Sequence, residues 1–265
     1  MLRAVHVLLT YTCLYRCEHC FLHCGPDAEG VFRLARLTEL LDQAAAMGGV
    51  EEVCYEGGEP FLHHPLLLRA VALAAERGFR VQALTNAYWA VHGEDTGLWL
   101  EPLAEAGLSG LGVSDDAYHH DPDRPSPARI ALDGAARLGL DAMALTIEPP
   151  EVRVDETKGR GEPVVGGGVR FRGRAADELT EGLPTRPWHT FTECPDEDLE
   201  HPSRVHVDPW GAVQLCQGVC IGSLEQAGLG EIMDGFDGAG HPLCGPLLRG
   251  GPAGLVEEYG LDCRG

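Results

Sequence analysis

Strand-like apolar runs alternate with helical patterns through the N-terminal part of this chain. The strands are predicted at Ala4–Thr10, Glu52–Tyr55, Arg80–Thr85, Leu108–Ser114 and Asp141–Ile147. From the second strand onward they start roughly 28 to 33 residues apart, the length of one strand-plus-helix unit. Apolar residues at three-to-four spacing predict helices between them, at Leu37–Met47, Pro65–Arg77, Gly97–Ala106 and Ala128–Leu138. The alternation predicts an α/β fold.

A sixth strand is expected around Val164–Phe171, although the glycines of Gly166–Gly168 weaken a strand at this place. Six such units predict a partial (β/α)6 barrel of the TIM type, with an open parallel sheet as the alternative. In both arrangements reactive groups lie at the C-terminal ends of the strands. The residues that follow each strand are therefore the candidates for a functional site.

The sequence changes character after about Pro184, where Pro, Trp, His and Cys become frequent. Arg204–Asp208 and Ala212–Cys216 read as two strands joined by a turn at Pro209–Gly211. We therefore expect a barrel over residues 1–183 and a small module with a β-hairpin over residues 184–265. A module of this size buries little apolar surface, and such modules often need a metal to be stable.

Charge and cysteine content exclude several classes of protein. The chain has 265 residues and a net charge of −21, which repels nucleic acids and anionic membranes. No apolar stretch approaches the ~18 residues that a membrane helix needs. The 10 cysteines, in a chain without a secretion signal, indicate metal or redox chemistry instead of disulfides. We expect a cytoplasmic protein with no nucleic-acid or membrane partner.

Three cysteines, Cys13, Cys17 and Cys20, follow the first predicted strand directly. Soft thiolates this close together suit zinc or an iron–sulfur cluster. Cys24 comes after three more residues, and a fourth ligand at that spacing is typical of ferredoxins, whose clusters are closed. A ferredoxin needs no large barrel, so we favour three ligands with Cys24 unused. Three ligands leave one iron open to a substrate.

The CxxxCxxC spacing of these cysteines resembles the signature of the radical S-adenosylmethionine (SAM) superfamily. The resemblance implies that Cys13, Cys17 and Cys20 hold a [4Fe–4S] cluster whose open iron binds the amino and carboxylate groups of SAM. It also implies that an electron from the cluster cleaves SAM to methionine and a 5′-deoxyadenosyl radical, which abstracts a hydrogen atom. His19 stands where the family usually has an aromatic residue.

A glycine pair follows the second predicted strand, in the sequence Glu56–Pro60. It resembles the GGE motif of the same superfamily, whose backbone holds the SAM amino group, and glycine lets the chain approach a ligand closely. Polar residues also end the third and fourth strands, where the family contacts SAM or its substrate. The competing interpretation is helix capping and turn formation. The residues assigned to cofactor binding are Gly57, Gly58, Glu59, Pro60, Asn86, Ser114 and Asp116.

Two further segments have open interpretations. The loop Asp115–Pro127 contains Tyr118, His119 and His120, and it suits either a substrate lid or a solvated polar surface. Arginines at 170, 172 and 174 could hold a substrate carboxylate or form salt bridges with the acidic surface.

The C-terminal cysteines resemble the auxiliary-cluster modules, of SPASM or twitch type, that many radical SAM enzymes carry. Cys194, Cys216 and Cys220 are the candidate ligands of one auxiliary iron–sulfur cluster, and Cys244 or Cys263 could supply a fourth. Structural zinc at the same thiols and free thiols are the alternatives.

The resemblance therefore implies an enzyme that abstracts hydrogen from a peptide or a small molecule, with an external electron donor such as flavodoxin or ferredoxin. Because the first strand starts at the N-terminus, we expect no leader-binding domain before it. The alternative is a non-catalytic iron–sulfur electron-transfer protein or a zinc-stapled binding protein.

Overall fold

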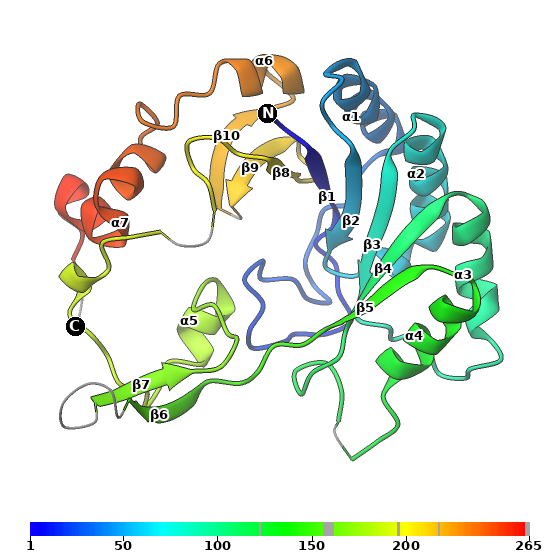
Figure 1. The fold of residues 1–265 in the computed structure, drawn as a ribbon, viewed down its shortest axis with the longest axis horizontal. Coiled ribbons are helices and arrows are strands. Elements are labelled where there is room, and N and C mark those ends of the chain that lie inside the picture. The colour runs from blue at the N-terminus through cyan, green and yellow to red at the C-terminus, as the bar shows by residue number, and fades with distance from the viewer. Residues whose placement is uncertain (122, 156–161, 195–196, 217, 263–265) are drawn as a thin grey trace.

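The first strand, β1 (Ala4–Thr10), lies inside the main sheet of the computed structural model (Figure 1). The structure describes residues 1–121, 123–155, 162–194, 197–216 and 218–262. Four parallel strands follow β1 on one side in chain order: β2 (Glu52–Gly57), β3 (Arg80–Thr85), β4 (Leu108–Ser114) and β5 (Asp141–Leu145). The five N-terminal strands predicted from the sequence are thus confirmed, and with them the α/β partial-barrel class.

Helices cover the outer face of this sheet, as Figure 1 shows on its right side. Val5, Val7 and Leu9 of β1 are fully buried in the apolar core, together with Leu37 and Leu40 of the first helix. Because strand side chains alternate between faces, His6 and Thr10 lie on the opposite, inner face. The four helices are α1 (Leu34–Ala46), α2 (His64–Glu76), α3 (Thr96–Glu105) and α4 (Pro127–Arg137).

The predicted C-terminal hairpin is present and extends the barrel sheet. Strand β8 (Arg204–Val207) pairs in parallel with β1, on the side opposite β2. Strands β9 (Ala212–Cys216) and β10 (Val219–Ser223) continue the sheet in antiparallel order. The helices α6 (Leu229–Asp234) and α7 (Cys244–Tyr259) follow. The division at residues 183 and 184 stays a prediction.

The expected sixth parallel strand around Val164–Phe171 is wrong. Strand β7 (Glu162–Gly166) pairs antiparallel with β6 (Glu151–Asp155) in a separate two-stranded sheet. Gly167 has a φ of 101°, and a Cβ there would overlap the carbonyl oxygen of Pro149. Gly167 therefore allows the chain after β7 to pass close to the backbone of Pro149, at the end of this hairpin. The short helices η1 (Pro60–His63), α5 (Arg174–Glu178) and η2 (Trp188–Thr190) complete the described elements.

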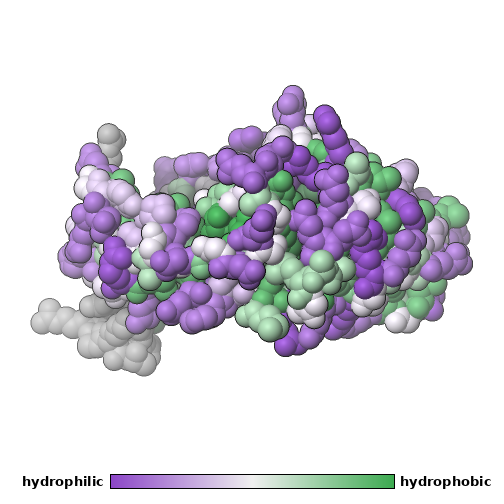
Figure 2. All heavy atoms as spheres, turned by 90° about the horizontal axis from the view of Figure 1, so that it is seen from above, coloured by the Kyte–Doolittle hydropathy of each residue, from purple (hydrophilic) through white to green (hydrophobic). Residues whose placement is uncertain are grey.

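The surface is largely hydrophilic on the face seen from above the view of Figure 1. Hydrophilic residues cover much of the face seen in Figure 2, with hydrophobic residues exposed between them. Among the helices that the structure describes, none has both the length and the apolar character needed to cross a membrane.

Candidate active site

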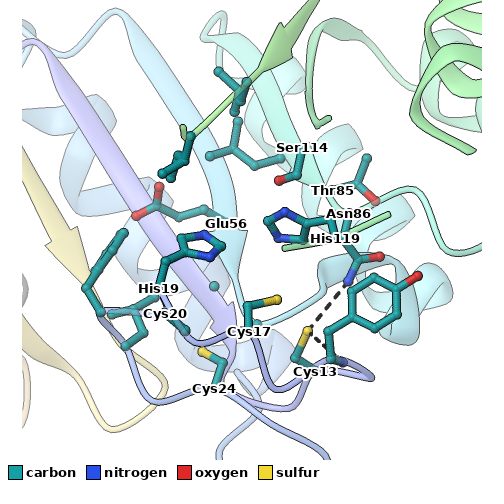
Figure 3. Close-up of a pocket in the computed structure, with 18 of the residues that line it drawn as sticks. Cys13, Cys17, His19, Cys20, Cys24, Glu56, Thr85, Asn86, Ser114 and His119 are labelled. Atoms are coloured by element: carbon teal, nitrogen blue, oxygen red, sulfur yellow. Dashed lines mark hydrogen bonds between the residues drawn. The ribbon is translucent and has the colours of Figure 1, made fainter. Parts of the chain in front are cut away.

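A cavity of ≈ 210 Å³ lies at the C-terminal ends of the parallel strands (Figure 3). The loop that follows β1 forms one wall of it. All three predicted cluster cysteines line this cavity, and so does Cys24. The structure thus brings the four N-terminal thiols of this loop into one space at the strand ends, where the sequence predicts a functional site.

Arg174, at the start of α5, fixes the shape of the cysteine loop. Its side chain is buried, and its guanidinium donates to the carbonyl oxygens of Cys17 at 2.6 Å and Cys24 at 2.7 Å. Its backbone N–H donates to the carbonyl of Cys20 at 3.1 Å. Neither sequence interpretation of Arg174 is correct, because this arginine binds the main chain of the loop instead of a substrate or the acidic surface.

The thiols repel one another when they ionise. Burial, followed by the charges of Cys13 and Cys20, raises the pKa of Cys17 to about 12. Burial also raises the pKa of Cys13. The neighbouring Cys24 thiol, through its side-chain hydrogen bond, lowers the pKa of Cys20 to about 6 despite burial. A positively charged metal centre would relieve this repulsion, since bound metals deprotonate thiols. The donor set thus fits an iron–sulfur cluster.

The glycine pair lies against the end of β1. Gly58 donates its N–H to the carbonyl of Thr10 at 2.7 Å, and Glu59 donates to Thr12 at 2.9 Å. A Cβ on Gly57 would overlap the Thr10 carbonyl oxygen, and one on Gly58 would overlap that of Thr12. Both glycines line the cavity. Glycine is therefore required at both positions because the chain after β2 packs directly against the chain after β1.

Glu59 and Pro60 lie behind the cavity wall. The Glu59 carboxylate accepts hydrogen bonds from Phe61 N at 2.9 Å, Thr85 Oγ1 at 2.9 Å and Asn86 N at 2.7 Å. Burial raises the pKa of this carboxyl to about 7, although these hydrogen bonds lower it. Pro60 is buried at the start of η1. Direct contact of Glu59 or Pro60 with SAM stays a prediction, whereas the geometry gives Glu59 a positioning role.

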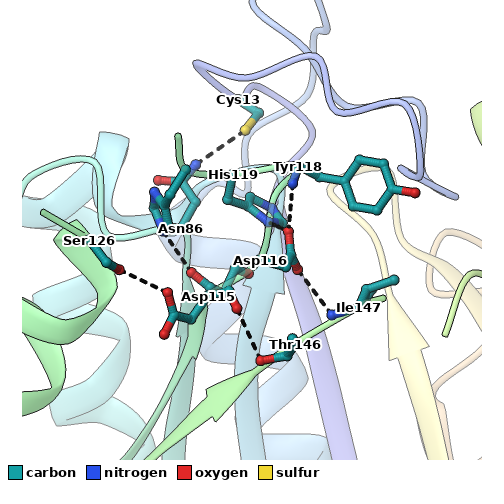
Figure 4. Close-up of polar contacts among 11 residues, drawn as sticks. Cys13, Asn86, Asp115, Asp116, Tyr118, His119, Ser126, Thr146 and Ile147 are labelled. Atoms are coloured by element: carbon teal, nitrogen blue, oxygen red, sulfur yellow. Dashed lines mark hydrogen bonds and ion pairs between the residues drawn. The ribbon is translucent and has the colours of Figure 1, made fainter. Parts of the chain in front are cut away.

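The predicted residues after β3 and β4 do line the cavity. Asn86 donates from Nδ2 to the Cys13 sulfur at 3.5 Å (Figure 4). Asp116 accepts hydrogen bonds from Tyr118 N at 3.0 Å and Ile147 N at 3.2 Å. Ser114 also faces the cavity. Their contact with SAM stays a prediction, and the bond from Tyr118 N to Asp116 agrees with the competing interpretation of turn formation.

The loop after β4 contributes Asp116 and His119 to the cavity wall, while Asp121 and residues 123–125 are exposed. His119 pairs through Nδ1 with Asp116 at 2.8 Å, and its ring lies 5.2 Å from that of His19, centroid to centroid. Burial, followed by the charge of His119, lowers the pKa of His19 to about 4. The sequence predicts Asp116 as a cofactor-binding residue but does not indicate that His19 and His119 lie beside it. The available signal was a histidine inside each of two loops at strand ends.

The C-terminal cysteines divide into two sets. Burial, followed by the charges of Cys194 and Cys216, raises the pKa of the Cys244 thiol, so this thiol lies within electrostatic range of the other two. Cys220 is exposed on β10, and its thiol contacts the Gly222 carbonyl at 3.2 Å. Cys263 lies outside the described residues. The structure thus brings Cys244, not Cys220, to Cys194 and Cys216.

Two curated proteins illustrate the sequence similarity of this chain to known proteins. The "GTP 3',8-cyclase" of Rhodococcus opacus (strain B4) is 30% identical over 155 residues, 54% of this chain and 42% of that protein. The "Putative peptide biosynthesis protein YydG" of Bacillus subtilis (strain 168) is 20% identical over 97% of this chain and 74% of its own length. The chain thus spans less than half of the cyclase and about three quarters of YydG.

Solved structures share the fold. BtrN in complex with AdoMet and 2-DOIA superposes with a TM-score of 0.56 at 16% identity, covering 88% of this chain and 82% of BtrN. Native anSMEcpe with bound AdoMet gives 0.53 at 12% identity, covering 88% of this chain and 80% of that protein. The sequence profile described as "Radical SAM superfamily" matches residues 7–148, more than half of the chain. The chain belongs to the radical SAM superfamily.

Proposed function

We propose that this enzyme cleaves SAM reductively at a [4Fe–4S] cluster held by Cys13, Cys17 and Cys20, and that the resulting 5′-deoxyadenosyl radical abstracts hydrogen from a peptide or a small molecule. One observation carries the proposal: the three thiols, the Gly57–Gly58 turn and the polar ends of β3 and β4 line a single cavity. Superfamily membership implies the cluster and SAM, and it removes the electron-carrier and zinc-protein alternatives.

The protein's own residues prepare this site. The cluster, when bound, supplies the electron that breaks the sulfonium. Arg174 fixes the loop that carries the thiols, and Asn86 donates a hydrogen bond to Cys13. The walls of the cavity limit the access of water, which protects a reactive radical from unwanted donors.

Cys24 is proposed as an unligated neighbour of the cluster. Its sulfur lines the same cavity, and its thiol hydrogen-bonds to the side chain of Cys20. A fourth protein ligand would close the iron that SAM needs. The thiol of Cys24 therefore acts on the ligand Cys20 instead of on iron.

For the substrate and the electron donor we propose only a chemical class. The name of YydG refers to peptide biosynthesis, and the complex of BtrN contains the small molecule 2-DOIA. These names support a peptide or a small-molecule substrate for this chain equally. An external donor such as flavodoxin or ferredoxin would deliver the electron, and the cysteine content favours a cytoplasmic location.

We also propose one auxiliary iron–sulfur cluster in the C-terminal region. The proximity of Cys194, Cys216 and Cys244 supports it. Zinc at the same thiols remains a second candidate, because three or four thiolates also suit tetrahedral zinc. Counting iron, sulfide and zinc on anaerobically reconstituted protein separates the two.

The main experiment incubates reconstituted enzyme with SAM and dithionite without oxygen. We expect release of 5′-deoxyadenosine, and we expect SAM to perturb the EPR signal of the reduced cluster. Replacing Cys13, Cys17 and Cys20 together by Ala should abolish both results. The matched control is Cys54→Ala, a buried cysteine in β2 that lines no part of the cavity.

Two results would contradict the proposal. One is intact SAM beside a fully reduced cluster. The other is a Cys24→Ala variant that loses the N-terminal cluster, together with an unmodified enzyme whose EPR signal SAM does not perturb, because Cys24 would then be a ligand that closes the cluster.

A further inference from the structure

Three ionisable side chains meet on the inner face of the sheet, beside the cavity described above. His6 lies on β1, Glu56 on β2 and His206 on β8. His6 and His206 are direct partners in the parallel register of β1 and β8. The Glu56 carboxylate contacts His6 Nδ1 at 3.1 Å and His206 Nδ1 at 2.7 Å. Three neighbouring strands thus place two imidazoles on one carboxylate.

The carboxylate is charged and nearly enclosed. Burial opposes its ionisation, but the hydrogen bonds from His206 and His6 outweigh burial and lower the pKa of Glu56 to about 2. The side chains of Glu56 and His206 are 11% and 4% exposed. Buried charges stabilise a fold poorly compared with packed apolar residues, and such groups concentrate at functional sites.

These side chains line a second cavity of ≈ 170 Å³. Arg170, Arg172 and Arg204 also line it, together with Glu197. Arg204 pairs with Glu197 at 2.7 Å, and Arg172 contacts the Cys216 sulfur at 2.6 Å. Three arginines and two glutamates therefore line one space, so the cationic side chains outnumber the carboxylates here in a chain whose net charge is −21. This concentration of positive charge is unusual for such an acidic protein.

The second cavity adjoins the cysteine-lined cavity. Glu56 and Phe21 line both of them. A ligand with two ends could therefore occupy both cavities, with one end near the thiols and the other end among the arginines.

The charges of the side chains in the second cavity determine whether it favours an anionic or a cationic ligand. One nitrogen of each histidine and one Glu56 oxygen lie within 4.8 Å of one another, a spacing that could suit a metal ion. However, the Nδ1 atoms of both histidines already contact Glu56, and the guanidinium groups would repel a divalent cation. Arginine instead binds carboxylates and phosphates through paired N–H donors. An anion fits this cavity better than a cation.

We propose that the second cavity binds an anionic oxygen group of the substrate, a carboxylate or a phosphate, while the carbon that loses hydrogen lies in the cysteine-lined cavity. This inference rests on the proposed function and narrows its substrate class. Arg170 lines this cavity and would donate to the anion, and Arg204 would add its positive charge while it keeps its ion pair with Glu197. Glu56 orients His6 and His206 toward the same cavity and keeps the inner face of the sheet polar.

The test measures anion binding to reconstituted, SAM-loaded enzyme by titration calorimetry at constant ionic strength. The probes are inorganic phosphate, succinate and the neutral succinamide. We expect saturable binding of phosphate or succinate with one site per chain, and no binding of succinamide. Whichever anion binds more tightly indicates whether the substrate carries a phosphate or a carboxylate.

The variant Arg170→Gln should weaken that binding about tenfold, because it removes one charge-assisted donor pair. Arg170 is exposed, so the variant should fold, and Arg170→Lys should restore part of the affinity. The matched control is Arg69→Gln, an exposed arginine on α2 that pairs with Glu76. It should bind the probes like the unmodified enzyme.

Three results would overturn the inference. They are the absence of saturable anion binding, equal binding of succinamide, and stoichiometric Co²⁺ binding to the cluster-loaded enzyme that Glu56→Gln abolishes. Failure of the proposed function looks different. An enzyme that binds anions here but releases no 5′-deoxyadenosine refutes SAM cleavage, whereas one that releases it and binds no anion refutes only this subsite.

Discussion

The N-terminal and C-terminal cysteines reach their sites in different ways. Cys13, Cys17 and Cys20 lie on one loop, which Arg174 holds through main-chain carbonyls. Cys194, Cys216 and Cys244 come from a segment before β8, the end of β9 and the start of α7. The first group is local in sequence, and the second depends on the packing of three separate elements.

This difference shows what each kind of site requires. Ligands that lie close together on one loop form a spacing that can be recognised in the sequence. Such a loop needs only one anchor to keep its geometry. Ligands from distant elements exist only when the elements around them pack. We therefore expect the two groups to respond differently to substitution.

The largest effect is expected at the anchor of the N-terminal loop. Arg174→Gln leaves buried carbonyl groups of Cys17 and Cys24 without their donors, each at a cost of ~1–3 kcal/mol. We expect the variant to lose about 4 kcal/mol in its free energy of unfolding and to retain little of the N-terminal cluster. Denaturant unfolding and the SAM-sensitive EPR signal measure the two effects. Equal cluster content in Arg174→Gln and the Arg69→Gln control would refute the anchoring role.

The second effect concerns the dispersed ligands. If the proposed auxiliary iron–sulfur cluster is present, Cys244→Ala should remove its iron, about four atoms per chain, and leave the SAM-sensitive signal intact. Cys220→Ala should retain all of the iron, because this thiol is exposed and apart from the others. Iron analysis of both variants makes the measurement. If Cys220→Ala loses iron and Cys244→Ala does not, the ligands are Cys194, Cys216 and Cys220, as predicted from the sequence.

The free energy of unfolding is expected to depend on pH through Glu59, which lies behind the N-terminal cavity. The pKa of Glu59 is about 7 in the fold against 4.5 for the ordinary group. The folded chain therefore holds a proton that the unfolded chain releases, and this stabilisation is lost as pH rises from about 4.5 to 7. At ~1.4 kcal/mol for each unit the loss is about 3 kcal/mol. The difference in unfolding free energy between the unmodified enzyme and Glu59→Gln, measured from pH 5 to 8, should follow this sign. A difference independent of pH would contradict it.

The smallest effect is expected at the glycine pair. Gly58→Ala forces its methyl group against the Thr12 carbonyl and should cost ~2 kcal/mol, with weaker SAM binding. Gly93→Ala is the control, because its Cβ would meet open space. Thermal unfolding and SAM titration compare the two variants. An equally stable Gly58→Ala enzyme would show that the two segments can separate without loss.

The sequence predicted local features well and distant pairings poorly. β1, β3 and β4 have the predicted bounds because apolar alternation and flanking turns are local signals. The pairing of β8 with β1 has no local signal, and neither does the departure of β7 into a separate hairpin.

The same limit applies to the sites. The cysteine spacing identified the N-terminal site, whereas the contacts of Arg174 with the loop join residues about 150 positions apart and could not be inferred. The group of His6, Glu56 and His206 is distributed over three strands and was missed for the same reason. Its faint signal was a charged or polar residue at inner positions of otherwise apolar strands.

The place of β1 between β2 and β8 has a consequence for biosynthesis. The second edge of β1 stays open on the nascent chain until Val207 leaves the ribosome. Roughly 150 residues separate β2 from β8, which at about 5–20 residues per second means a delay on the order of 10 s. Arg174 also emerges late in translation. We therefore expect iron and sulfide to be inserted only after Arg174 and β8 have emerged, and the exposed edge of β1 to make the nascent chain a client for chaperones until then.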